Sequence, residues 1–125
     1  MSSSYIIFSK KLDRTMTYNE LVSEKQLKSK SIQIINHSLS FLGENAKNAI
    51  FYHFMKNKKL NTIEDIIDYI DEFEEFIIGV FGYGATFILP IIINRLYNQF
   101  NVEPHSFAQL SLAKAIKDIK QRMVQ

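Results

Sequence analysis

The chain has no cysteine and no tryptophan among its 125 residues. The lack of cysteine excludes disulfides, thiolate nucleophiles and zinc sites built on thiolates, and it is typical of an intracellular protein. A secretory signal is not indicated either, because the apolar run from Tyr5 to Phe8 is too short and no basic residue precedes it. We therefore expect a cytoplasmic protein.

Charge is missing from one long segment of the chain. Between Phe76 and Ile93, eighteen residues contain no charged side chain, although they hold three of the four glycines and one of the two prolines. The segment is long enough to cross a bilayer. However, Gly82-Tyr83-Gly84 interrupts it, and apolar residues at helical spacing continue upstream to Ile63, as in a soluble amphipathic helix. We therefore predict two core helices joined by a turn at Gly82, Tyr83 and Gly84, and no membrane partner.

The first half of the sequence predicts a flexible tail at residues 1–16, followed by a single helical domain at residues 17–125. A capping box that begins at Thr17 starts a helix at Tyr18. Between residues 32 and 42 apolar residues recur at helical spacing, and Gly43 can end that helix in the left-handed conformation. The next helix is expected at residues 45–57, with a buried face made of Ala46, Ala49, Ile50 and Phe54.

The second half predicts three more helices. Thr62 supplies an N-cap for an acidic helix, which could break near Tyr69. After the glycines, residues 85–100 form what should be the most buried helix, and Pro90 should either kink it or mark its first turn. A capping box at residues 106–109 opens a last helix that ends near Met123.

The predicted fold is all-α, a compact bundle of four to six helices, because no strand alternation occurs beyond the first ten residues. With 46% hydrophobic residues, the chain can form one domain with a real core. We expect that core to contain Ile35, Leu39, Ile50, Phe54, Phe73, Phe76, Ile77, Phe81, Ile88, Ile91 and Ile92.

Acidic residues are concentrated between residues 60 and 76, which contain seven acids and no base and leave the rest of the chain with a charge of +9. Four of these acids are spaced to share one helix face and could hold a hard cation. The chain lacks the Glu-x-x-His pairs of a di-metal site and the loop of an EF-hand. Because the acids lie opposite the apolar stripe, we interpret them as a solvated face; the four are Glu64, Asp68, Glu72 and Glu75.

No group of residues indicates catalysis or a cofactor. The histidines His37, His53 and His105 are not at metal-ligand spacing, and His53 is expected to be buried or half-buried beside Phe54. The glycines at residues 82–84 precede a helix and could bind phosphate, but no strand comes before them and no Walker lysine follows. We therefore expect no enzyme, no metal and no cofactor.

Basic residues are frequent in the last helix, where a single acid, Asp118, accompanies them. If folding places them beside the lysines of residues 25–30 or 56–59, the two groups would form a surface that contacts phosphates. The same spacing is also typical of an ordinary solvated face. A DNA-binding regulator is therefore the alternative function, and its candidate residues are Lys114, Lys117, Lys120 and Arg122.

Several short motifs in residues 32–102 resemble the archaeal Nitrosopumilus output domain family. The resemblance implies a small helical domain, alone or appended to archaeal signalling proteins, with an output or interaction role and no catalytic residue. The chain departs from the family near Leu89 and Pro90, where the family has a polar, often acidic residue. The motifs are Leu42-Gly43, Ala49-Ile50, the aromatic pair Phe73 and Phe76, and Phe81-Gly82-Tyr83-Gly84-Ala85.

Together these features predict a non-enzymatic interaction or regulatory module whose partner is another protein or a second copy of the chain. A homodimer is expected, because residues 85–93 carry more apolar surface than a small bundle can cover. A third class, a bundle that binds an apolar ligand near Tyr83 and Tyr97, is not separable from core packing by sequence.

Overall fold

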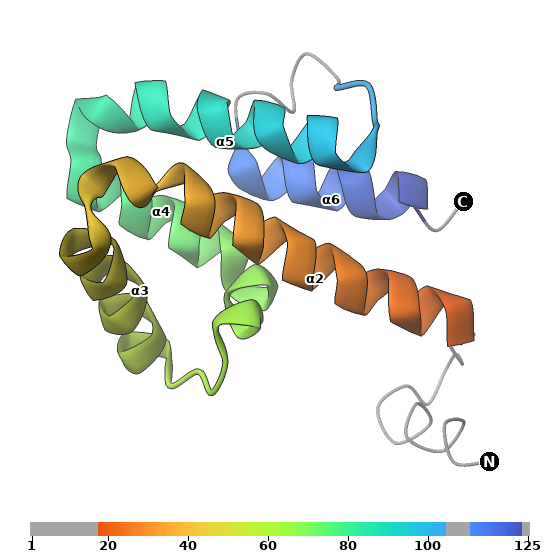
Figure 1. Cartoon of the computed structure of the whole chain (residues 1–125), viewed down its shortest axis with the longest axis horizontal. Helices are drawn as coiled ribbons and strands as arrows, with labels where there is room; N and C mark the ends of the chain where they lie inside the picture. The colour runs from red at the N-terminus through yellow and green to blue at the C-terminus, as the bar shows by residue number, and fades with distance from the viewer. Residues whose placement is uncertain (1–17, 105–110, 124–125) are drawn as a thin grey trace.

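The computed structural model describes residues 18–104 and 111–123, with the side chains of residues 18–22 left out. The described residues contain five α-helices and three short 3-10 helices and no strand, so the fold is all-α (Figure 1). In chain order these elements are α2 (Tyr18–Ser38), η1 (Ser40–Leu42), α3 (Glu44–Lys58), η2 (Ile63–Tyr69), α4 (Ile70–Phe81), η3 (Gly82–Gly84), α5 (Ala85–Phe100) and α6 (Leu112–Met123).

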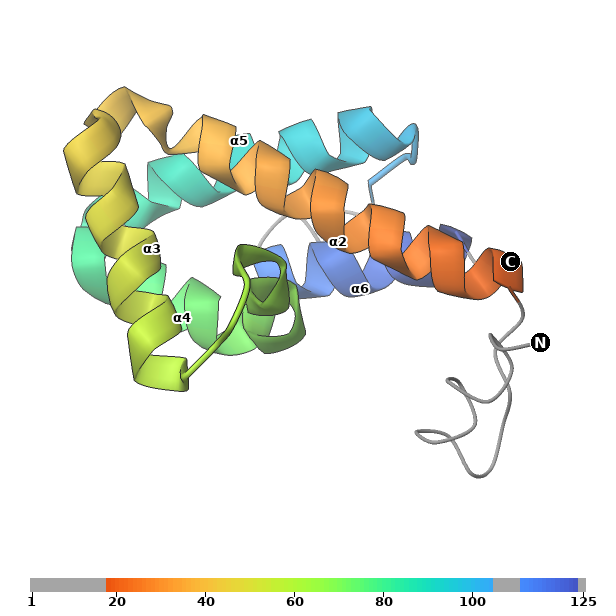
Figure 2. The same cartoon turned by 60° about the horizontal axis from the view of Figure 1, so that its bottom comes forward.

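The long helix α2 runs across the molecule and packs against η2 and α5, while α6 lies along α5 and also contacts α4 (Figures 1 and 2). Helix α3 lies at one edge, where it contacts η1 and η2. The turn from α4 to α5 and the connection from α2 to α3 occupy the same end of the molecule in Figure 1. That end is opposite the start of α2 and the end of α6.

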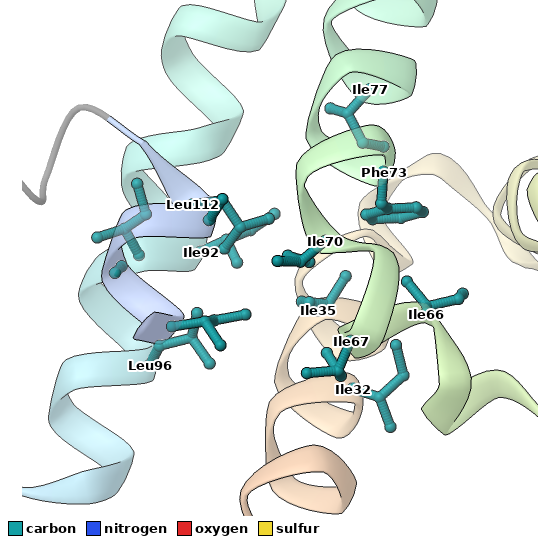
Figure 3. Close-up of a cluster of buried hydrophobic side chains, with 14 of the residues drawn as sticks. Ile32, Ile35, Ile66, Ile67, Ile70, Phe73, Ile77, Ile92, Leu96 and Leu112 are labelled. Atoms are coloured by element: carbon teal, nitrogen blue, oxygen red, sulfur yellow. The ribbon is translucent and has the colours of Figure 1, made fainter. Parts of the chain in front are cut away.

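The core lies where α2, η2, α4, α5 and α6 meet (Figure 3). Ile70 sits at its centre and points from α4 toward Ile92 and Leu112, with Ile35 of α2 beside it. Each of these side chains is at most 5% exposed. Of the predicted core residues, those fully buried are Ile35, Leu39, Ile50, Phe54, Phe73, Ile77 and Ile92, while Phe76, Phe81 and Ile88 are partly buried against them.

Aromatic side chains fasten α3 to α4. The rings of Phe51 and Phe73 are stacked, with centroids 5.8 Å apart. Phe54 meets Phe73 edge-on at 5.1 Å, and its centroid is 5.6 Å from that of Phe76. Such pairs contribute about 0.5–1.5 kcal/mol each beyond the area that they bury.

The predicted bounds of α3 are confirmed within one residue at each end, and its predicted buried face is confirmed for Ile50 and Phe54 but wrong for Ala46 and Ala49. Ala46 and Ala49 are exposed, and the core side of α3 carries Phe51 and Lys47 together with Ile50. The large Phe51 ring gains more from burial than an alanine methyl, which sets the rotation of the helix. The Lys47 ammonium is tolerated because it lies 3.1 Å from a Glu44 carboxylate oxygen and 3.4 Å from the Ser40 hydroxyl.

The acidic helix breaks at Tyr69, at the position where the sequence indicated that a break could occur. Thr62 and Asp65 form the start, where the Thr62 backbone N–H donates to the Asp65 carboxylate at 3.2 Å. The segment is a 3-10 helix as far as Tyr69, whose backbone (φ −119°, ψ 37°) leaves the helical region before α4 begins. Glu64 and Asp68 therefore lie on a different element from Glu72 and Glu75.

Glu74 belongs to the acidic segment but not to the four acids that we assigned to a solvated face, and it is buried. Its carboxylate is buried and accepts hydrogen bonds from the Leu112 N–H at 2.7 Å, the Ala113 N–H at 3.1 Å and the Ser111 hydroxyl at 3.1 Å. Ser111 in turn accepts from the Lys114 N–H at 3.2 Å, as an N-cap residue does. The carboxylate thus satisfies free donors at the start of α6, where negative charge is favoured.

Helix α5 is less buried than predicted. Leu89, Ile92, Ile93 and Leu96 face the core, but Ile91, predicted to be core, is 50% exposed. Pro90 lies inside the helix, past its first turn, and it is exposed. The proposed role of Pro90 as the first-turn residue is therefore wrong.

Two glycines have positive φ, where other residues are strained. Gly43 (φ 92°, ψ 156°) follows η1, so the predicted left-handed helix end at this glycine is wrong, although its φ is positive. Gly82 (φ 57°, ψ −129°) follows α4 directly. The predicted tail at residues 1–16, the capping residue Thr17, and the capping box at residues 106–109 lie outside the described residues, while Tyr18 and Met123, at the limits of the described residues, are both helical.

Replacement of Gly82 tests the backbone alone, because a Cβ added at Gly82 or at Gly79 would meet no heavy atom within 4 Å. Gly82→Ala should lower the free energy of unfolding by about 1–2 kcal/mol and Gly82→Val by more, since both side chains disfavour positive φ. Gly79→Ala, within α4, should raise it by about 0.5–1 kcal/mol. Urea unfolding of the three variants measures these changes in the free energy of unfolding. Equal midpoints for Gly82→Ala and Gly79→Ala would contradict the claim that Gly82 needs a positive φ.

Loss of the Glu74 carboxylate should be costly. Glu74→Ala leaves two backbone N–H groups and a hydroxyl without their partner at a buried helix start, so we expect it to lower the free energy of unfolding by about 3 kcal/mol. Its exposed neighbour gives the matched control, because Glu75→Ala should change the same quantity by less than about 0.5 kcal/mol. Thermal and urea unfolding provide both numbers, and a mild effect of Glu74→Ala would show that α6 does not depend on this cap.

Candidate interaction surfaces

The largest exposed apolar side chains gather at the end of the molecule where α4 turns into α5. Tyr83 is 82% exposed, Phe87 and Phe41 are each 65% exposed, and Ile91 is 50% exposed. The Tyr83 and Phe87 rings are in edge contact, with centroids 6.0 Å apart. Phe41 comes from η1, so two distant parts of the sequence contribute to this surface, which we call the α5 surface.

The α5 surface contains a groove of about 640 Å³ between η1 and α5. Its apolar lining is formed by Phe41, Phe87, Ile88 and Ile91. Polar groups lie at its border, and there the Arg95 guanidinium donates to the Ser38 hydroxyl at 3.1 Å. The remaining lining residues are His37 and Ser40.

The α5 surface has the size of the largest apolar patch on a typical monomer. An aromatic side chain presents roughly 150–250 Å². From the exposed fractions of its four apolar side chains, the surface offers about 450 Å² of contiguous apolar area. This lies within the range of about 300–600 Å² that typifies the largest patch of a monomer, and patches of that size often function in binding.

The same region has the composition of a membrane span. By length and composition, the helical segment Ile63–Phe100 could cross a membrane: its most apolar window of 18 residues has a mean hydropathy of 2.2, and only 28% of that window is buried. The core helices of soluble proteins also pass this test when they are mostly buried. Here one side of α4 and α5 is in the core and the other side is exposed.

A second groove, of about 790 Å³, lies between α3 and the C-terminal half of α4. Its floor contains Ile50, Phe76 and Val80. Along one side the lining is basic, with Lys56 and Lys59, and none of its lining residues is acidic. We call it the α3–α4 groove; its other lining residues are Ala49, His53 and Asn57.

His53 lies on this groove and is exposed, so its predicted burial is wrong. Helix α3 turns Phe54 inward and presents His53 to solvent. The His53 ring is in edge contact with the Tyr52 ring, with centroids 5.7 Å apart. Among the residues that the structure describes, no three His, Cys, Asp or Glu side chains are placed to hold a metal ion.

The basic residues of α6 are brought to one region, but most of them face acids. The Lys120 ammonium lies 2.9 Å from the Glu24 carboxylate, and that of Lys117 lies 3.7 Å from Asp71. Arg122 pairs with Asp118 at 3.1 Å and also donates to the Glu103 carbonyl. Lys114 is exposed.

Asp118 also joins α6 to α5. The Tyr97 hydroxyl donates to the Asp118 carboxylate at 2.7 Å. Burial, and then the neighbouring carboxylate, raise the pKa of the Tyr97 phenol well above its ordinary value, so the phenol stays protonated as the donor. Tyr97 is thus a core residue about 20 Å along α5 from the exposed Tyr83, which disfavours one ligand cavity shared by both.

The three predicted turn residues, Gly82, Tyr83 and Gly84, lie together at the exposed end of the molecule. Sequence reasoning identified α5 as unusually apolar but did not find the groove, because Phe41 is some forty-six residues from Phe87. Nor did it find the α3–α4 groove, whose lysines were grouped only by proximity in sequence. A comparison of the chain with protein-family models, curated proteins and solved structures gives no match, so the resemblance to the Nitrosopumilus output domain family stays a prediction.

Proposed function

We propose that the chain is a non-enzymatic interaction or regulatory module that works as a homodimer through the α5 surface. The observation that supports this most is the contiguous apolar area of Phe41, Tyr83, Phe87 and Ile91, which water covers in the monomer. Apolar area removed from water contributes about 25 cal/mol per Å², so its burial in a dimer is favourable.

A second copy fits this surface for geometric reasons. A two-fold interface uses the same patch on both subunits, so the patch must be complementary to itself. The α5 surface is suited to this, because the exposed rings of Phe41 and Phe87 line the rim of a groove of about 640 Å³. Each Phe87 can therefore enter the groove of the other copy, with Arg95 at the polar border of the interface.

The proposed module is a compact bundle of four to six helices whose turn at Gly82, Tyr83 and Gly84 serves the interface. Positive φ at Gly82 lets α4 end abruptly, so that α5 begins after only the three residues of η3. The Thr86 hydroxyl donates to the Tyr83 carbonyl at 2.7 Å and helps to hold this turn. The turn in this way fixes Tyr83 beside Phe87.

A charge at the centre of the surface should separate the two copies. Phe87→Glu would place a carboxylate from each copy in an apolar contact, so we expect the dimer dissociation constant to rise at least about 100-fold. Because Phe87 is 65% exposed, the monomeric Phe87→Glu variant should have the melting temperature of the unmodified monomer. Tyr52→Glu, at a residue 58% exposed on α3, is the control and should leave the dimer intact.

Sedimentation velocity over a range of concentrations measures both variants against the unmodified chain of 14.6 kDa. A wild-type chain that remains monomeric at about 100 µM would contradict the proposal. Flotation of that monomer with phosphatidylcholine–phosphatidylglycerol vesicles, lost in Phe87→Glu, would assign the surface to lipid instead.

The rival function is a DNA-binding regulator that uses Lys114, Lys117, Lys120 and Arg122. Its support is weaker, because phosphates would have to displace the carboxylates of Glu24, Asp71 and Asp118 from three of the four side chains. Exposed ion pairs are worth about 1 kcal/mol or less, so the displacement is possible, but the free positive charge of this helix is small.

We expect a labelled random duplex titrated with the protein to show no binding tighter than about 100 µM at 50 mM salt. We expect this low affinity because few cations on α6 are without an acidic partner. Fluorescence anisotropy at 50 and 200 mM salt measures it. Micromolar affinity that falls steeply with salt and is lost in a triple alanine variant of Lys114, Lys117 and Lys120 would favour the rival function.

A further inference from the structure

The α3–α4 groove has the form of a site for a helix. Its lining residues on α3 run from Ala49 to Lys59, a rise of about 15 Å, or nearly three helical turns. On α4, Phe76 and Val80 are one turn apart and form the apolar floor opposite α3. The groove is open along its length, since Ala49, His53 and Val80 are all exposed. An open apolar trough between two helices is a common seat for a third amphipathic helix.

The charge of the groove selects among such helices. Lys56 and Lys59 line it, and Lys58 is next to them in the sequence. Within the described parts of the chain, none of the three has a carboxylate within 4.0 Å, whereas Lys28, Lys47, Lys117 and Lys120 are each paired with one. The Lys56 ammonium lies 5.7 Å from the centroid of the Tyr52 ring. The groove therefore offers positive charge that the described residues do not neutralise.

The backbone at Lys59 is in a conformation that disfavours a side chain. Lys59 ends α3 in the left-handed conformation (φ 58°, ψ 47°), and its N–H bonds to the carbonyls of Lys56 and Met55. Glycine is the usual residue at such a helix end, and a longer side chain there is strained. The Lys59 side chain therefore lies at the rim of the groove at a conformational cost.

We propose that the α3–α4 groove binds an acidic amphipathic helix of another protein, with its apolar stripe on Phe76 and Val80 and its carboxylates at Lys56 and Lys59. The acidic segment of a second copy is a poor occupant, because its apolar side, which includes Ile66, Ile70 and Phe73, is buried in its own core. A fatty acyl chain needs an enclosed cavity, whereas this groove is open. The proposal shares no lining residue with the α5 surface and does not depend on the dimer.

A synthetic helical peptide tests the proposal. We would use a labelled, capped peptide of about 16 residues, about 24 Å long as a helix, with leucine at every third or fourth position and glutamate beside the leucines. One control peptide has lysine in place of each glutamate, and a second has the same composition with the leucine stripe scrambled. Fluorescence anisotropy with the full chain should give micromolar affinity for the acidic peptide, weaker at 200 mM than at 50 mM salt, and none for the controls.

Three variants separate the contributions of charge and of the apolar floor. Lys56→Glu should weaken peptide binding at least about 10-fold. Val80→Asn, which adds no charge, should weaken it about 3-fold or more through the lost apolar contact. Lys59→Gly is diagnostic, because it should weaken binding while raising the melting temperature of the protein by relief of the left-handed strain. Lys114→Glu on α6 is the matched control and should bind the peptide as the unmodified chain does.

The outcomes divide clearly. Equal binding of the acidic and basic peptides, or loss of affinity in Lys114→Glu as large as in Lys56→Glu, would overturn the proposal in favour of non-specific attraction. Full peptide affinity in Val80→Asn would contradict the proposed apolar contact at Val80. No binding of the acidic peptide would overturn it as well, and dodecanoate that raises the melting temperature in that case would assign the groove to a lipid. Phe87→Glu should retain peptide binding, so failure of the dimer leaves this test intact.

Discussion

The arrangement of the helices depends on one buried carboxylate. Glu74 extends from α4 to the start of α6 and joins residues 37 to 39 positions apart through the Ser111 hydroxyl and the N–H groups of Leu112 and Ala113. A carboxylate is expensive to bury, and here the free donors of a helix start offset that cost and fix its position. With α6 so placed, Leu112, Ile116 and Ile119 complete the core against Ile92 and Leu96. The electrostatic contact thus determines which faces of α4 and α5 are covered.

Those faces account for the unusual distribution of apolar surface. Eighteen uncharged residues surround the turn from α4 to α5, and α2 and α6 cover only one side of them. Tyr83, Phe87 and Ile91 remain on the other side with Phe41. Exposure of this apolar surface to water costs free energy, and the dimer that we propose would remove that cost. The α3–α4 groove lies at a different edge and is lined by Lys56 and Lys59, which have no carboxylate partner among the described residues.

Much of the fold could be predicted from the sequence because local signals were strong. Helical spacing of isoleucine and phenylalanine predicted the fold class, and Thr62 and Gly82 marked helix ends close to their observed positions. The errors came from tertiary contacts. Glu74 has the same local pattern as its exposed neighbours, and only α6 distinguishes it. Ala46 and Ala49 fit an apolar stripe, but the Phe51–Phe73 stack rotates α3 away from them. Both candidate surfaces combine residues from separate elements, so spacing along the chain does not reveal them.

The central claim, that two copies meet at the α5 surface, is tested most directly without altering the chain. An isotope-filtered NOE experiment on an equal mixture of carbon-13-labelled and unlabelled protein detects only contacts between copies, and a dimer of about 29 kDa is within its reach. The account predicts intermolecular contacts from the Phe87 and Phe41 rings to the methyl groups of Ile88 and Ile91. A spectrum with no intermolecular contact at high concentration, or with contacts confined to the α3–α4 groove or to α6, would contradict it.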